Sequence, residues 1–344
     1  RVGARRGGRP PALVAMAPVD TALRLYWAMV AVFTAALVYT VFNFPAPEFS
    51  PAPVIKCKPW SPLRPRCDEG CNVEFALQLP ALRCVPARRQ VKKKISGGGG
   101  LRKAEGLVSG SARSAANCLA AADIFEAAAE AESGKAAADL QLKAADALTC
   151  AMRINGDGNL VLIDGVLDTP SNKQYWGTHG PRALALARAA TSHASFASDA
   201  RAAATEMDAF MYAAASKGIL QQALTGTGVE FRKKSEHLVA KYTNWDSAAG
   251  HVYLGGFYLV APWPLGDKKR AVSEYQRAVD LAPTSKRNLY YLCLAAMQTQ
   301  QPARAASACE AAVHAKCRGP TEPDYCARID AEAKRVLAMA TAAA

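Results

Sequence analysis

The sequence has little of what enzymes ordinarily use for catalysis. Its 344 residues include five histidines, and none lies in a His-x3-His pair or at ligand spacing from a cysteine. No nucleophile-elbow motif occurs, and no Lys-Ser/Thr pair follows the glycines at 97–100, which excludes a phosphate-binding loop. A calcium loop beginning at Asp157 fails because apolar Val161 stands at its fifth position, so we expect a turn between helices there. We therefore expect a protein that is not an enzyme and has no metal or cofactor of its own.

Acidic residues are scarce in the first third of the chain. Nearly all of the formal net charge of +13 lies in residues 1–24 and 45–104, whereas residues 105–344 hold 25 Lys/Arg and 24 Asp/Glu. A nearly neutral C-terminal region is a poor match for the phosphate backbone, so we expect no nucleic-acid partner. A hydrophobic content of 51% is enough to build a core, which excludes a disordered chain.

Ten cysteines are too few for a small disulfide scaffold of this length, so any disulfides are expected to be local. The clearest groups are Cys57, Cys67, Cys71 and Cys84, spaced C-x9-C-x3-C-x12-C, and the pair Cys317 and Cys326 around a Gly-Pro turn. For the first group two disulfides are favoured, with a four-thiolate zinc site and unpaired thiols as alternatives. Cys317 and Cys326 are candidates for a loop disulfide. Cys293 and Cys309 occupy small-residue core positions, either as buried thiols or as a bridge between helices.

Residues 25–44 contain no charge and no proline. A helix of this length spans about 30 Å, which is the thickness of a bilayer core. Aromatic residues stand near both ends, as is typical of the two membrane interfaces, and Pro45 follows the last residue. We predict a single transmembrane helix at 25–44, preceded by a basic tail at 1–24. A buried core helix and a signal-peptide core are the alternatives.

Basic residues flank this span on both sides, so charge alone does not predict its orientation. The Arg-rich start lacks acidic residues up to position 19, which is typical of an organellar targeting segment. Residues 45–104 are rich in proline and predict an extended arm that ends in a flexible glycine linker. The basic residues of the arm are candidates for contacts with lipid headgroups or a partner subunit, or else for a solvated linker: Arg83, Arg88, Arg89, Lys92, Lys93 and Lys94.

From residue 105 to 344 the sequence predicts an all-α domain. Ala-rich stretches at 115–132 and 135–153, separated by Ser133-Gly134, predict an antiparallel helical hairpin. Asp168-Thr169-Pro170 predicts a helix start, and the stretch Pro181–Ala190 predicts a further helix that resembles the second helix of a repeat. Further helices are expected at 200–220 and 230–242, and a capping helix at 325–341.

Two segments carry a repeat pattern. Leu254, Gly255 and Tyr258 are followed by Ala271, Tyr275, Ala278 and Pro283, and Ala271 to Ala305 is a period of 34 residues. A second copy contains Leu289, Leu292, Cys293 and Ala296, then Ala305, Cys309 and Ala312. Over residues 180–340 the chain resembles tetratricopeptide-repeat proteins, which implies a right-handed superhelix of helical hairpins and a binding scaffold without catalysis. It is loosely similar to the T-component family of tripartite periplasmic transporters and to the regulator-of-microtubule-dynamics group.

Taken together, these patterns predict a single-pass structural or accessory subunit of a large organellar membrane complex, photosynthetic or respiratory. Its partners would be the other subunits and membrane lipids, with contact to lipids or pigments of neighbouring subunits, and Trp245 and Trp263 near loops are candidate contact residues. A plastid thylakoid is favoured and the mitochondrial inner membrane is the alternative. Disulfides would place the C-terminal domain in the lumen or the intermembrane space. Two further hypotheses are a membrane-tethered adaptor or assembly factor for a mobile partner, and a carrier of a small hydrophobic ligand.

Overall fold

The computed structural model describes residues 71–73, 84–86, 98–218, 221–222 and 225–344. The predicted transmembrane helix at 25–44, Cys57, Cys67 and all six basic candidates of the arm lie outside these residues. The chain divides into two units, residues 1–90 and 91–344. In the first unit, strands β1 (Cys71–Val73) and β2 (Cys84–Pro86) pair in antiparallel fashion, with Cys71 opposite Pro86 and Val73 opposite Cys84. The pairing of the four arm cysteines therefore stays a prediction.

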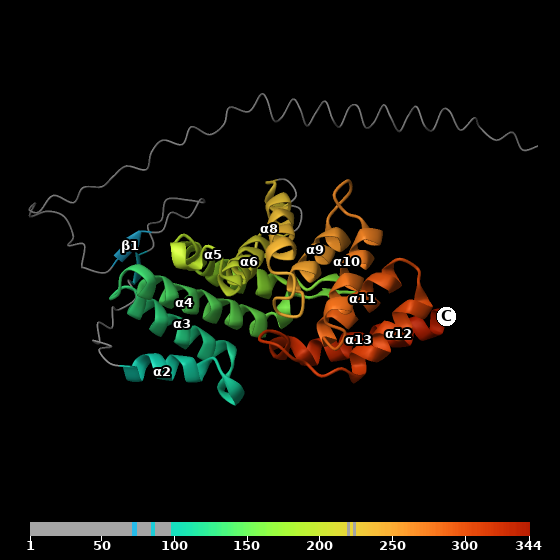
Figure 1. Ribbon diagram of the computed structural model, residues 1–344, viewed down its shortest axis with the longest axis horizontal. Helices are drawn as coiled ribbons and strands as arrows, with labels where there is room; N and C mark the ends of the chain where they lie inside the picture. Colours follow the sequence, from blue (N-terminus) through green and yellow to red (C-terminus); the bar gives the residue numbers. More distant parts are fainter. Residues whose placement is uncertain (1–70, 74–83, 87–97, 219–220, 223–224) are drawn as a thin grey trace, which may run out of the picture. The chain divides into compact units, whose positions relative to one another are not determined.

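The second unit is built from helices, which confirms the all-α class (Figure 1). They are α2 (Gly98–Leu107), α3 (Ala115–Ala129), α4 (Gly134–Asn155), α5 (Pro170–Thr191), α6 (Ala200–Ala215), α8 (Thr227–Lys241), α9 (Ala249–Val260), α10 (Lys268–Leu281), α11 (Lys286–Gln298), α12 (Pro302–His314) and α13 (Cys326–Ala343), with a short 3-10 helix η4 (Glu322–Tyr325) before the last. Each packs against the next along the chain. None of the helices among the described residues is long and apolar enough to cross a bilayer.

The predicted helical hairpin near the start of this unit is present as α3 and α4. Ser114 begins α3 by accepting a hydrogen bond from the backbone N–H of Asn117, and Gly134 begins α4 with a positive φ of 58°. A disulfide between Cys118 and Cys150 joins the two helices. This bridge was not among the predicted cysteine pairs.

Helix α5 confirms one predicted helix start and includes a second predicted helix. Thr169 caps the helix by accepting a hydrogen bond from the N–H of Asn172, and Pro170 takes the first helical position. Residues Pro181–Ala190 are helical as predicted, but they do not form a separate helix, because Pro181 lies inside α5. An internal proline costs about 3 kcal/mol in a helix, and burial of the flanking Trp176 and Ala183 against neighbouring helices offsets that cost.

Two helix boundaries and one connection differ from the sequence predictions. Of the glycines predicted as a flexible linker, Gly98, Gly99 and Gly100 form the first turn of α2 (Gly98–Leu107), and Gly97 lies outside the described residues. The helix predicted to reach residue 220 ends at Ala215. Between α4 and α5 the chain adds a short antiparallel hairpin, β3 (Val161–Leu162) and β4 (Gly165–Val166), where only a turn was expected. Val161 and Leu162 are buried, so Val161 contributes to the hydrophobic core.

The repeat-pattern residues lie where α9 to α12 press together. Ala271, Tyr275 and Ala278 are fully buried, and α10 ends two residues before Pro283. A side chain at Gly255 would begin only 2.7 Å from the Tyr275 ring, so no other residue fits without displacement. Cys293 on α11 and Cys309 on α12 form a disulfide, which selects the bridge between helices over buried thiols.

Replacing Gly255 with alanine is expected to destabilise the domain by about 1–3 kcal/mol, because the new methyl group overpacks a fully buried ring. Gly256 is the matched control on the same helix. A Cβ there meets only the Tyr275 hydroxyl at 3.6 Å, so Gly256→Ala should be neutral or stabilise by up to about 1 kcal/mol through helix propensity. Thermal unfolding followed by circular dichroism measures both. Equal melting temperatures for the two variants would contradict the packing account.

Candidate binding pocket

The buried apolar residues of the second unit form two main clusters. One lies among α2 to α6 and includes Trp176 and Tyr212, and the other lies among α9 to α13 and the β3–β4 hairpin and includes Tyr275 and Tyr290. A pocket of about 180 Å³ opens where the two clusters meet. Residues from both clusters contribute to the walls of the pocket, so a ligand bound there would contact both halves of the core.

The walls of the pocket are mainly apolar and aromatic. They come from the β3–β4 hairpin, α6, α8, α9 and the loop after α9, and the lining includes Leu160, Val161, Met211, Tyr212, Phe231, Val252, Phe257, Val260, Pro262, Leu265, Tyr291 and Tyr325. Polar side chains converge at one end, namely Arg153, Asp208, Tyr253, Arg287 and Thr321. A concave apolar site with a few convergent polar groups is the usual form of a small-molecule site.

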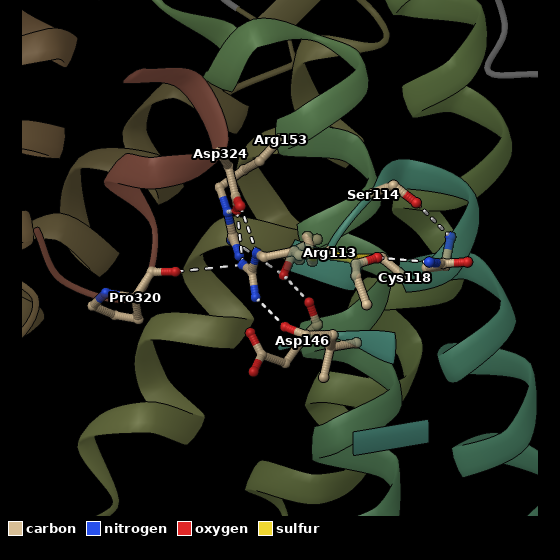
Figure 2. Close-up of a disulfide and its surroundings, with 12 residues drawn as sticks. Arg113, Ser114, Cys118, Asp146, Arg153, Pro320 and Asp324 are labelled. Atoms are coloured by element: carbon tan, nitrogen blue, oxygen red, sulfur yellow. Dashed lines mark hydrogen bonds and ion pairs between the residues drawn. A yellow bond between two sulfur atoms is a disulfide. The ribbon is translucent and has the colours of Figure 1, made fainter. Parts of the chain in front are cut away.

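The polar end of the pocket continues into a buried ion-pair network centred on Asp324 (Figure 2). Arg153 donates from Nε to Asp324 Oδ2 at 2.9 Å and from Nη1 to Asp208 Oδ2 at 2.7 Å. Arg113 donates from Nε to Asp324 Oδ1 at 2.6 Å and from Nη2 to Oδ2 at 2.8 Å. Asp324 is only 1% exposed, and its partners lie in the other half of the domain. The network therefore joins the early helices of the second unit to the segment before its last helix.

A second buried ion pair lies beside the first, because Asp246 is close enough to interact electrostatically with both Arg153 and Asp208. Arg287 on α11 donates from Nη1 to Asp246 Oδ2 at 2.9 Å and also binds the backbone carbonyl of Asp246. The Thr321 hydroxyl donates to the same carboxylate at 2.7 Å. Tyr253 donates its hydroxyl to Asp208, which brings α9 into the network. Three arginines face three aspartates across the two groups, so the charges balance.

Two carboxylates of the buried ion pairs, Asp208 and Asp246, differ in their proton affinity. Burial raises the pKa of Asp208 above its usual value, and the nearby Arg153 only partly offsets this. Burial also acts to raise the pKa of Asp246, but Arg287 and the Thr321 hydrogen bond outweigh it and hold that pKa below its usual value. Asp246 consequently contributes stability that is lost only as the pH falls through its depressed pKa.

One hydroxyl in the pocket wall has no partner. The Tyr212 side chain is 0% exposed, and its hydroxyl makes no hydrogen bond within the described part of the chain. Burial raises the pKa of Tyr212 well above its usual value, so the hydroxyl stays neutral and keeps its proton. A buried donor without an acceptor costs about 1–3 kcal/mol. Tyr212 is therefore an unsatisfied donor in a side chain that lines the pocket.

The residues predicted from sequence mostly lie away from this pocket. Trp263 is 91% exposed in the loop after α9, and Trp245 is half-buried. The predicted disulfide between Cys317 and Cys326 is present, and it closes the segment that carries Thr321 and Asp324. Within the ranges that the structure describes, no group of three or more His, Cys, Asp or Glu is placed to hold a metal ion.

Sequence reasoning missed the charged residues of the pocket, although a signal was present. Arg153 follows the apolar run Cys150-Ala151-Met152, and Asp208 stands between Met207 and Ala209 in another. A charge inside an apolar helical stretch is expensive to bury unless it is paired. Such positions are therefore candidates for a buried ion pair, although their partners cannot be read from spacing.

The chain was compared with known proteins. No protein-family model matches it, and no curated protein matches it.

Proposed function

We propose that the chain is a non-catalytic binding protein whose helical domain belongs to the tetratricopeptide type of superhelix. A transmembrane helix at 25–44 anchors it, and it acts as a structural or accessory subunit of a large organellar membrane complex. Support comes from the repeat positions, since Gly255 on α9 lies against Tyr275 on α10, where the pattern requires two helices to touch. Consecutive packing of α9 to α12 is the arrangement that such repeats need.

The observation that carries a contact role is Trp263. It is 91% exposed, whereas the other exposed large apolar residues of the described part of the chain reach only 45% (Leu281) and 41% (Met339). Tryptophan is enriched among residues that dominate protein interfaces. Its loop leaves α9 and contributes Pro262 and Leu265 to the pocket wall, so a partner on Trp263 would lie next to the pocket.

Replacing Trp263 with alanine is expected to weaken association with the partner subunit by about 30-fold, which corresponds to a typical interface hot spot of about 2 kcal/mol. The measurement is co-migration of the full chain with its complex on a native gel of detergent-solubilised membranes. Met339→Ala on α13 is the control and should co-migrate as wild type does. Migration of the wild-type chain only as a free monomer would overturn the subunit proposal. Loss of the partner at about 0.5 M salt would instead favour an adaptor that binds through screened charges.

A second candidate function is a carrier of a small apolar ligand. The specific observation in its favour is the pocket between the two core clusters, with the unpartnered hydroxyl of Tyr212 in its wall. This function is compatible with the first, because a subunit of a membrane complex can also hold a small molecule. Native mass spectrometry of the full chain released from detergent would reveal a retained ligand.

A further inference from the structure

We infer that the pocket binds a compact, uncharged ring compound that carries a hydrogen-bond acceptor such as a carbonyl oxygen. Its ring would lie among the apolar side chains of α8 and α9, and its acceptor would receive the hydrogen bond of Tyr212. This inference rests on the carrier function proposed above and gives it a ligand class. It is independent of the role of Trp263 as a contact residue.

The size of the pocket sets the first limit on the ligand. An apolar cavity of about 150 Å³ holds benzene, so about 180 Å³ accommodates one ring with a small substituent. Phe231, Val252, Phe257 and Val260 supply the apolar surface. Such a lining favours a ring over a flexible polar molecule, because burial of apolar area provides most of the binding free energy.

The unpartnered donor sets the second limit. Tyr212 retains its proton and is buried, and its hydroxyl has no acceptor within the described residues. A ligand that offers an oxygen acceptor removes the cost of the unsatisfied donor, whereas a pure hydrocarbon does not. A site with a buried polar group favours a ligand that can hydrogen-bond to that group over a ligand of the same shape that cannot.

The closed charge network sets the third limit. Arg153 is bound to Asp208 and Asp324, and Arg287 is bound to Asp246. These pairs neutralise one another beside the pocket. A charged ligand would have to give up its hydration without gaining a free counter-charge, which is unfavourable in a buried site. The ligand is therefore uncharged.

Three probes of similar size and different chemistry test these limits. Acetophenone offers a ring and a neutral carbonyl, α-methylstyrene replaces the C=O with a C=CH2 group of similar shape, and benzoate carries a charge. The measurement is the increase in melting temperature of the full chain, titrated with each probe in one detergent. We expect acetophenone to bind about 5-fold more tightly than α-methylstyrene, which is the ratio for one hydrogen bond of about 1 kcal/mol. Benzoate should bind more weakly than either.

Two variants assign the preference to one hydroxyl. Tyr212→Phe keeps the ring and removes only the unpartnered hydroxyl, so it should fold at least as stably as wild type and lose the 5-fold preference for acetophenone. Tyr275→Phe is the matched control, because Tyr275 is also 0% exposed with an unpartnered hydroxyl but does not line the pocket. It should keep the preference. Partition of the probes into detergent is the same for all three proteins and cancels in the comparison.

The inference is overturned if no probe raises the melting temperature, if benzoate binds as well as acetophenone, or if Tyr212→Phe retains the preference. These results would leave the subunit role intact, because co-migration on the native gel is measured without any probe. Conversely, a chain that migrates only as a monomer yet shows the acetophenone preference would lose the subunit role and keep the ligand site.

Discussion

Asp324→Asn is expected to lower the stability of the helical domain by about 3–5 kcal/mol, among the largest effects of a single substitution in this chain. Asp324 is 1% exposed and accepts hydrogen bonds from both Arg113 and Arg153. Its removal leaves two guanidinium groups facing an amide, and an uncompensated buried charge costs far more than a surface pair contributes. For a domain of this size the melting temperature should fall by about 10 °C or more.

A surface pair with similar geometry is the control for Asp324. Asp164 accepts a hydrogen bond from Arg335 at 2.6 Å, but its side chain is 76% exposed. Asp164→Asn should change stability by less than about 1 kcal/mol. Thermal unfolding of the two variants at low and high salt distinguishes a buried ion pair from a surface pair. The loss of stability in Asp324→Asn should persist at high salt, where surface charges are screened. Similar melting temperatures for both variants would show that Asp324 does not join the two halves.

Local patterns predicted much of the helical framework. Thr169 and Pro170 predicted the start of α5, and the Gly255–Tyr275 contact follows from the repeat positions. Both predictions are correct because helix caps, helix ends and contacts within one repeat depend on residues close in sequence. Pro181 misled the prediction because local sequence favours a helix boundary at a proline. The packing that keeps α5 continuous through Pro181 comes from helices distant in sequence, which local patterns do not show.

The pocket could not be predicted in this way. Arg153 and Asp324 are separated by 171 residues, and the pocket exists only where the two core clusters meet. No repeat period relates these positions, so spacing alone cannot pair them. By contrast, the Cys118–Cys150 disulfide was within reach of sequence reasoning. The two cysteines are equidistant from Gly134, the turn of the predicted hairpin, and an antiparallel pair of helices brings equidistant residues together.

Removing that disulfide is the second change with a large expected effect. Cys118 and Cys150 are both buried, and their bond closes a loop with a sequence separation of 32. The chain-entropy relation gives a stabilisation of about 3–4 kcal/mol for such a loop, so Cys118→Ala with Cys150→Ala should lower the melting temperature by about 10 °C. Cys317→Ala with Cys326→Ala is the comparison, because its separation of 9 predicts a smaller loss of about 2–3 kcal/mol.

The same bond tests where the domain resides. Disulfides persist in oxidising compartments, and the proposed position of the domain in a lumen or an intermembrane space requires that Cys118 and Cys150 be oxidised in the native protein. Alkylation after denaturation, with and without a thiol reductant, followed by intact-mass measurement, determines their state. We expect both to react only after reduction. Free thiols at these two positions in protein taken from its native membrane would exclude the oxidising compartment. Cys118→Ala with Cys150→Ala would then show none of the loss of about 3–4 kcal/mol expected from loop closure, because a bond that never forms closes no loop.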